Sequence, residues 1–119
     1  MNELWFRRKY LPYLVTGQLR ATLREGRRDE HHPKGYRLGE KVLLRCFDLP
    51  GEDEFRTNAV VTQLSFFRIG ELRPDVLRGG PPDCLTKETA VETLESLYRR
   101  PFGEDETVTL LHLDYLKEQ

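Results

Sequence analysis

The sequence predicts an α+β fold that is mainly β: a small, mostly antiparallel barrel with a short N-terminal helix and one longer helix. Segments in which apolar residues alternate with polar ones outnumber the segments with helical spacing. The connections between the predicted strands are mostly too short for parallel crossovers. The 119 residues fit a single domain, residues 1–119, and no internal repeat or low-complexity segment interrupts them.

The predicted elements follow in the order strand, short helix, several strands, longer helix and final strand. Residues 3–8 are aromatic and loosely alternating, which suits a strand. Pro12 is tolerated only in a first turn, so a short helix begins near Leu11 and ends at Gly17. Alternation then predicts strands over residues 19–24, 42–47, 55–70 and 106–116, the third of them bent. Helical spacing places the longer helix over about residues 86–99, where Pro101 closes it.

The same patterns predict which side chains form the core. A residue is expected to be buried where it belongs to the apolar set of an alternating or helical segment. The expected core residues are Leu19, Ala21, Leu23, Val42, Leu44, Val60, Leu64, Leu94, Leu110 and Leu113.

Charge is divided unevenly along the chain. Residues 1–46 contain eleven Lys and Arg against five Asp and Glu, a net charge of +6, whereas residues 47–119 contain eight against fifteen, a net charge of −7. A basic half can attract phosphate while the whole chain stays near neutrality. The alternative is that the two halves interleave in space and the asymmetry averages out.

Several classes of protein do not fit the sequence. No apolar run approaches the roughly 20 residues that span a bilayer, and the first residues lack a signal pattern, so we expect a soluble, cytoplasmic monomer without membrane contact. Cys46 and Cys84 are far apart and are expected to be reduced thiols. His31 and His32 have no further ligands at a set spacing, so we expect no metal and no cofactor.

Polar side chains at alternate positions of one predicted strand are the main candidates for a binding site. Arg20, Thr22 and Arg24 share one face, opposite the apolar set. Guanidinium groups present forked donors that match phosphate oxygens, and a threonine hydroxyl adds another bond. The alternative is a solvated strand face whose arginines form surface ion pairs.

The polar segment that follows, residues 25–37, is predicted to be a long mobile loop, of a length that is often functional or disordered. Its basic residues can close over a bound nucleic acid as a lid: Arg27, Arg28, Lys34 and Arg37. Aromatic residues that can stack on bases are Trp5, Tyr10, Tyr13 and Tyr36. For Trp5 the favoured interpretation is a place in the core.

A glycine followed by threonine five positions later and arginine seven positions later resembles the ASCH domain. Its signature has the form Gly-x-Lys-x-x-(Glu/Thr)-x-Arg, which matches Gly17, Thr22 and Arg24. The resemblance continues through GEKVLLR (39–45), VVTQL (60–64), the helix that ends at Tyr98, and VTLLHLDYL (108–116). It implies a PUA-like barrel that binds RNA or a nucleotide.

One branch of that family hydrolyses N4-acylated cytidines and is thought to use a lysine, a threonine and a glutamate. The resemblance places Thr22 at the nucleophile, Asp83 about where the glutamate stands, and Leu19 at the lysine. Arg20 does not replace the lysine as a base, because arginine stays protonated in proteins. We therefore expect amidohydrolase activity to be low or absent.

Together these observations predict an RNA- or nucleotide-binding module. Its ligand is expected in a cleft beside Thr22 and Arg24, with Gly17 and Arg20 as further ligand-binding residues. One alternative is a hydrolase acting on acylated cytidine nucleosides or RNA, with Thr22 and Asp83 as catalytic residues. The other is a protein-interaction module without a nucleic-acid site.

Overall fold

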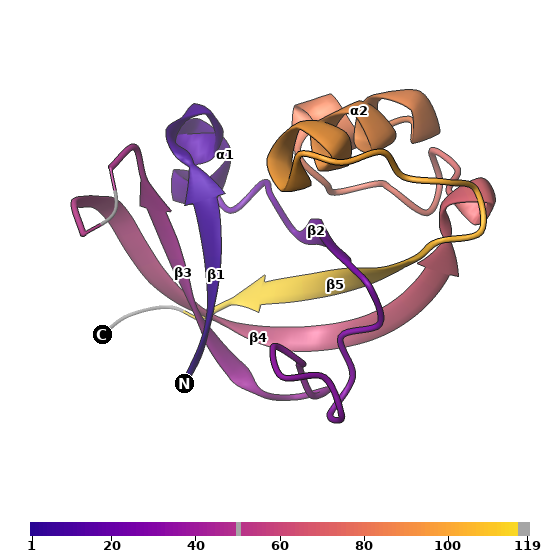
Figure 1. Cartoon of the computed structure of the whole chain (residues 1–119). Helices are drawn as coiled ribbons and strands as arrows, with labels where there is room; N and C mark the ends of the chain where they lie inside the picture. Colours follow the sequence, from indigo (N-terminus) through magenta and orange to yellow (C-terminus); the bar gives the residue numbers. More distant parts are fainter. Residues whose placement is uncertain (50, 117–119) are drawn as a thin grey trace.

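The computed structural model describes residues 1–49 and 51–116, which form one strongly curled sheet with helices over its upper side (Figure 1). The strands are β1 (Asn2–Arg7), β2 (Ala21–Glu25), β3 (Lys41–Phe47), β4 (Asp53–Arg68) and β5 (Thr107–Tyr115). They lie in the order β1-β3-β4-β5-β2, and only the β1–β3 pair is parallel. The predicted mainly β, mostly antiparallel fold is confirmed, with a barrel that stays open between its edge strands β1 and β2.

The helices begin and end where the sequence signals them. A 3-10 turn, η1 (Arg8–Tyr10), leads into α1 (Leu11–Val15), which has a proline in its first turn, and Gly17 follows it with φ +75°. The 3-10 turns η2 (Ile69–Glu71) and η3 (Pro82–Cys84) precede α2 (Lys87–Tyr98). Thr86 caps α2 by accepting a hydrogen bond from the Thr89 N–H, and Arg99 ends the helix in the left-handed conformation. Both predicted helices are confirmed.

The long strand β4 joins the two halves of the sheet. It pairs with β3 through its first half and with β5 through its second, and a bulge between Val61 and Gln63 shifts the register. A bulge bends a strand and increases its twist, which accounts for the curl of the sheet. Val61 is buried here and Val60 only half-buried, so the expectation that Val60 lies in the core is wrong.

Apolar side chains form two clusters rather than one. The first lies inside the curl and joins β1, β3, β4 and β5; its members include Leu4, Phe6, Leu19, Val42, Leu44, Val61, Leu111 and Leu113. The second lies between β2, β5 and α2; its members include Ala21, Leu23, Leu77, Leu94, Phe102, Val108 and Leu110. Eight of the ten expected core residues are buried; Val60 and Leu64 are half-buried.

Two further features bear on the earlier expectations. Cys46 and Cys84 are both free thiols and both buried, as expected. No helix within residues 1–49 and 51–116 has the length and apolar character needed to cross a membrane.

We expect the substitution Leu111→Ala to lower the free energy of unfolding by about 2–5 kcal/mol, because it removes a fully buried side chain from the strand that both clusters share. Urea denaturation measures the change. The control is Leu38→Ala, which truncates a side chain that is 68% exposed and is expected to change stability by less than about 0.5 kcal/mol. Equal effects of the two substitutions would contradict the packing described here.

Candidate functional site

Strand β2 presents different side chains to its two faces. Thr22 pairs with Leu111, and Arg24 with Thr109, so Thr22 and Arg24 point toward the inside of the curl. Ala21 and Leu23 point the other way and pack in the second cluster, toward α2. The predicted alternation therefore holds from residue 21 onward, and it places Thr22 and Arg24 on one face.

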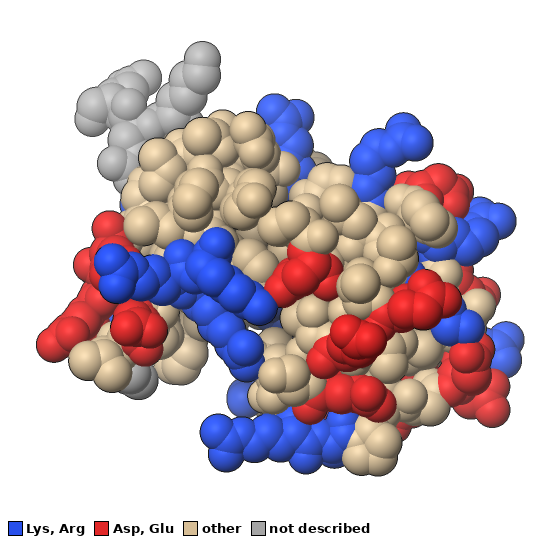
Figure 2. Space-filling view, turned by 90° about the horizontal axis from the view of Figure 1, so that it is seen from above, with Lys and Arg blue, Asp and Glu red and all other residues tan. Residues whose placement is uncertain are grey.

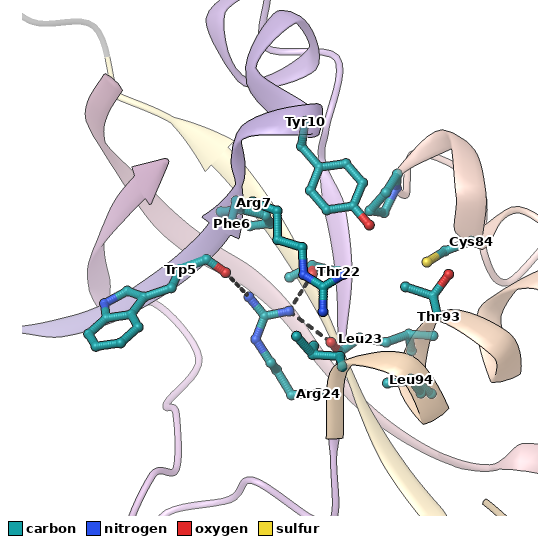
Figure 3. Close-up of a pocket in the computed structure, with 12 residues that line it drawn as sticks. Trp5, Phe6, Arg7, Tyr10, Thr22, Leu23, Arg24, Cys84, Thr93 and Leu94 are labelled. Atoms are coloured by element: carbon teal, nitrogen blue, oxygen red, sulfur yellow. Dashed lines mark hydrogen bonds between the residues drawn. The ribbon is translucent and has the colours of Figure 1, made fainter. Parts of the chain in front are cut away.

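The guanidinium of Arg24 spans the opening between the two edge strands (Figure 3). Its Nη1 donates to Thr22 Oγ1 at 2.7 Å and to the carbonyl of Leu23 at 2.8 Å, both on β2. Its Nη2 donates to the carbonyl of Trp5 on β1 at 3.3 Å. These contacts use three of the five N–H donors of arginine, so two are left for a ligand.

Two cavities meet at Arg24, and together they form what we call the cleft. The narrow cavity has a volume of about 60 Å³ and is lined by mostly apolar and aromatic groups, among them Phe6, Tyr10, Thr22, Cys84 and Leu94. The wide cavity has a volume of about 470 Å³, and its lining includes Asn2, Arg28, Lys34, Tyr36 and Tyr98. Three residues line both cavities: Trp5, Arg24 and Leu97.

The cations of the cleft lack carboxylate partners. Within residues 1–49 and 51–116, no ion pair is formed by any of the four basic side chains that line it: Arg7, Arg24, Arg28 and Lys34. Many basic residues elsewhere are paired, as Arg45 is with Asp53 at 3.0 Å. The one carboxylate that lines the wide cavity in the described chain, Glu3, is itself bound to Arg45. The cleft therefore has an excess of positive charge.

Burying these positive charges costs free energy, because they lose their hydration. Arg28 is only 7% exposed; its Nε donates to the Glu25 carbonyl, and its Nη2 donates to the Tyr98 hydroxyl. Burial lowers the pKa of Arg24, and the charge of Arg28 lowers it further, although nearby tyrosines oppose the change. Arginine nevertheless stays protonated. Two like charges on a buried and a half-buried side chain, both held by neutral oxygens, favour the entry of an anion.

Trp5 forms an aromatic wall at the junction of the two cavities. The Trp5 residue is 59% exposed, because Leu4 and Phe6 occupy the alternate positions that face the core. The Trp5 Nε1–H donates to Glu3 at 2.8 Å, and the ring meets Phe47 edge to face with centroids 5.4 Å apart. The favoured interpretation of Trp5 as a core residue is therefore wrong, and the ring is held in place with much of its surface open.

Asp83 lies beside the narrow cavity, where it joins the N-terminal segment to η3. Its carboxylate accepts hydrogen bonds from Lys9 Nζ at 2.7 Å and from the Tyr10 hydroxyl at 2.9 Å. Burial alone would raise the pKa of Asp83, but these two hydrogen bonds outweigh it and the pKa lies below its usual value. The carboxylate is thus ionised and already engaged by neighbours.

The structure does not bring Gly17 and Arg20 to the cleft. The strand begins only at Ala21, because the N–H groups of Arg20 and Ala21 both donate to the Gly79 carbonyl and turn the chain there. Arg20 is exposed, and its Nε donates to the Gly17 carbonyl. The expectation that Arg20 shares a concave surface with Thr22 is wrong, and Gly17 ends a helix instead.

The proposed lid divides into two pairs. Arg28 and Lys34 line the wide cavity, whereas Arg27 and Arg37 lie outside both cavities. Arg27 pairs with Asp29 at 3.0 Å and lies over the ring of Phe66. The loop is anchored to the sheet, since the Arg28 N–H donates to Thr109 Oγ1 at 2.8 Å.

Sequence reasoning missed several residues at this site: Arg7, Lys9, Leu97 and Tyr98. The exposure of Trp5 was available from the alternation of Leu4 and Phe6 in β1. The others carry no such signal, because they reach the cleft from segments far from β2 in the sequence.

Comparison with known proteins identifies the fold. No family model and no curated protein matches the chain. The crystal structure of an ASCH domain from Lactobacillus crispatus JV V101 has a TM-score of 0.61 at 15% identity, covering 87% of this chain and 68% of that one. The structure of protein EF3133 from Enterococcus faecalis V583, of the family DUF984, has a TM-score of 0.64 at 13% identity, covering 98% of this chain and 80% of that one. The chain therefore has an ASCH-like fold, as the sequence resemblance implied.

We expect Asp83→Asn to lower the free energy of unfolding by about 1 kcal/mol at pH 7, because it removes the charge that Lys9 and Tyr10 share across a partly solvated contact. A depressed carboxyl pKa stabilises the folded state above the unfolded pKa of about 3.9, and this contribution disappears as pH falls through the folded value.

Urea denaturation of the natural protein and of Asp83→Asn at pH 7 and pH 3 tests this expectation. The difference between their free energies of unfolding should be smaller at pH 3 than at pH 7. Asp75→Asn, at an exposed pair with Arg73, is the control and should have little effect at either pH. A difference for Asp83→Asn that is constant with pH would contradict the assignment.

Proposed function

We propose that this protein binds RNA or a nucleotide in the cleft between β1 and β2. One observation carries the proposal: two guanidinium groups without carboxylate partners in the described chain, the buried one of Arg28 and the half-buried one of Arg24, line a cavity of about 470 Å³ whose other walls include aromatic rings. A ligand with a planar base and a phosphate provides both the stacking surface and the negative charge that such a cavity lacks.

The donors of the cleft fit this chemistry. Arg24 retains two N–H groups and Arg28 three, which suits forked bonds to phosphate oxygens. Lys34 adds a point charge at the edge of the wide cavity. The indole of Trp5 offers an open surface to a base.

The surface around the cleft supports the same function. Figure 2, seen from the side of the helices, shows a diagonal group of Lys and Arg side chains on one half of this face, with Asp and Glu side chains on both sides of it and further Lys and Arg side chains around the rim. A local group of basic side chains attracts a polyanion.

We expect Arg24→Ala to weaken the binding of nucleoside monophosphates and short RNA by about 1–3 kcal/mol, because a charged contact between a half-buried guanidinium and phosphate is lost. Arg24→Lys should restore only part of the affinity, since an ammonium cannot reproduce the forked contacts. Isothermal titration calorimetry measures both.

The control for this experiment is Arg20→Ala, which removes a neighbouring arginine that lies outside both cavities. Circular dichroism melting establishes that each variant is folded. Unchanged affinity in folded Arg24→Ala would show that Arg24 does not hold the ligand.

Hydrolysis of an acylated cytidine nucleoside or of RNA is the second candidate, and one observation favours it. Lys9 brings an amine to Asp83, beside the cavity that Thr22 lines, although the position that resembles the lysine of the hydrolases is Leu19. Two contacts oppose activity. Lys9 donates its hydrogen bond to Asp83, and the Thr22 hydroxyl oxygen accepts from Arg24, so neither arrangement removes the proton of Thr22.

We therefore expect no turnover of N4-acetylcytidine above the rate in buffer, followed by liquid chromatography of the released cytidine. Thr22→Ala and Lys9→Met are measured beside the natural protein. Turnover by the natural protein that both variants abolish would make the protein a hydrolase.

A further inference from the structure

We propose that the ligand of the cleft is a single-stranded oligonucleotide that contacts the protein through several phosphates, with one base stacked on Trp5. This inference rests on the proposed function and specifies its ligand. Three features of the cleft carry it: the spread of its cations, the position of Trp5 and the dimensions of the opening.

The unpaired cations are distributed along the whole cleft rather than gathered at one point. Arg7 lines the narrow cavity, Arg24 lies at the junction, and Arg28 and Lys34 line the wide cavity. Figure 3 shows Arg7 reaching between Tyr10 and Arg24 at the narrow end. One phosphate group is satisfied by one or two arginines, so cations at both ends and at the junction match a chain of phosphates better than a single one.

Trp5 occupies the place between these cations, since it lines both cavities. Its hydrogen bond to Glu3 and its edge contact with Phe47 hold the indole, and the guanidinium of Arg45 lies 5.7 Å from the ring centre. A rigid, exposed ring loses little freedom when a base stacks on it. The arrangement thus alternates phosphate-binding and base-stacking groups, as a strand of nucleic acid requires.

The dimensions of the cleft favour a single strand. The wide cavity, of about 470 Å³, is bounded by β1, the loop at Pro33 and Lys34, and the end of α2 at Leu97 and Tyr98. A pocket of this size accepts one nucleotide with its base unpaired, whereas a duplex keeps its bases stacked inside. The neighbouring nucleotides would continue past Trp5 toward Arg7.

The test uses the fluorescence of Trp5, which is the only tryptophan of the chain. The protein is titrated with UMP, with oligouridylates of two, four and six nucleotides, with the matching single-stranded DNA oligomers, and with a self-complementary RNA duplex. Each titration is repeated across a series of salt concentrations. We expect quenching of Trp5 and an affinity that rises from UMP to the tetramer.

The salt dependence of the binding constant reports how many phosphates contact the protein. The slope of log K against log salt should become steeper from UMP to the tetramer, by roughly 0.7 for each added phosphate contact. Arg7→Met should reduce the slope for the tetramer by about one such step, and by more than it reduces the slope for UMP. Trp5→Leu, followed by anisotropy of a labelled tetramer, should weaken binding about tenfold without changing the slope.

Arg73→Met is the matched control, because Arg73 lies outside both cavities and pairs with Asp75; it should change neither affinity nor slope. Binding of either the RNA or the DNA strand supports the proposal, and these two arms identify which strand is preferred. Equal affinity and equal slope for UMP and the hexamer would overturn the inference and leave a mononucleotide site. Duplex binding as tight as single-strand binding would also overturn it. Failure of every oligomer and of UMP to bind would overturn the proposed function itself.

Discussion

The architecture depends on a sheet that curls almost into a barrel and stays open between β1 and β2. Edge strands leave backbone carbonyls without partners, and carbonyls away from water need donors. Arg24 supplies them on both sides of the opening, to Leu23 on β2 and to Trp5 on β1. Arg24 thereby stabilises the opening and also places in it a positive charge that no carboxylate of the described chain pairs with. The same side chain therefore contributes to both the fold and the candidate site.

The opening lies where the two apolar clusters meet. Phe6 and Tyr10 come to its narrow cavity from the first cluster, and Leu23 and Leu94 come from the second. Strands β4 and β5 contribute to both clusters, and the bulge in β4 bends that strand between them. Beside the narrow cavity, the contact of Asp83 with Lys9 and Tyr10 ties η3 to the N-terminal segment.

Local patterns predicted the elements and part of the site. Alternation correctly placed Thr22 and Arg24 on one face, and the proline and glycine signals gave the helix limits. Alternation failed for Arg20, because a carbonyl from a distant residue, Gly79, delays the start of β2. The basic loop predicted Arg28 as a lid residue, but the contact of Arg28 with Tyr98 was beyond local patterns, since only the pairing of β2 with β5 and the packing of α2 bring the two residues together.

The structure explains why Leu19 stands at the position that resembles the lysine of the hydrolases. Its side chain is fully buried in the first cluster, where a lysine would carry an unpaired charge away from water. The amine that does approach this region, from Lys9, holds Asp83 and thereby fixes η3 against the N-terminal segment. Thr22 in turn serves as an acceptor for Arg24. Groups that resemble a catalytic set are thus engaged in hydrogen bonds with their neighbours, and none of these contacts removes the proton of Thr22.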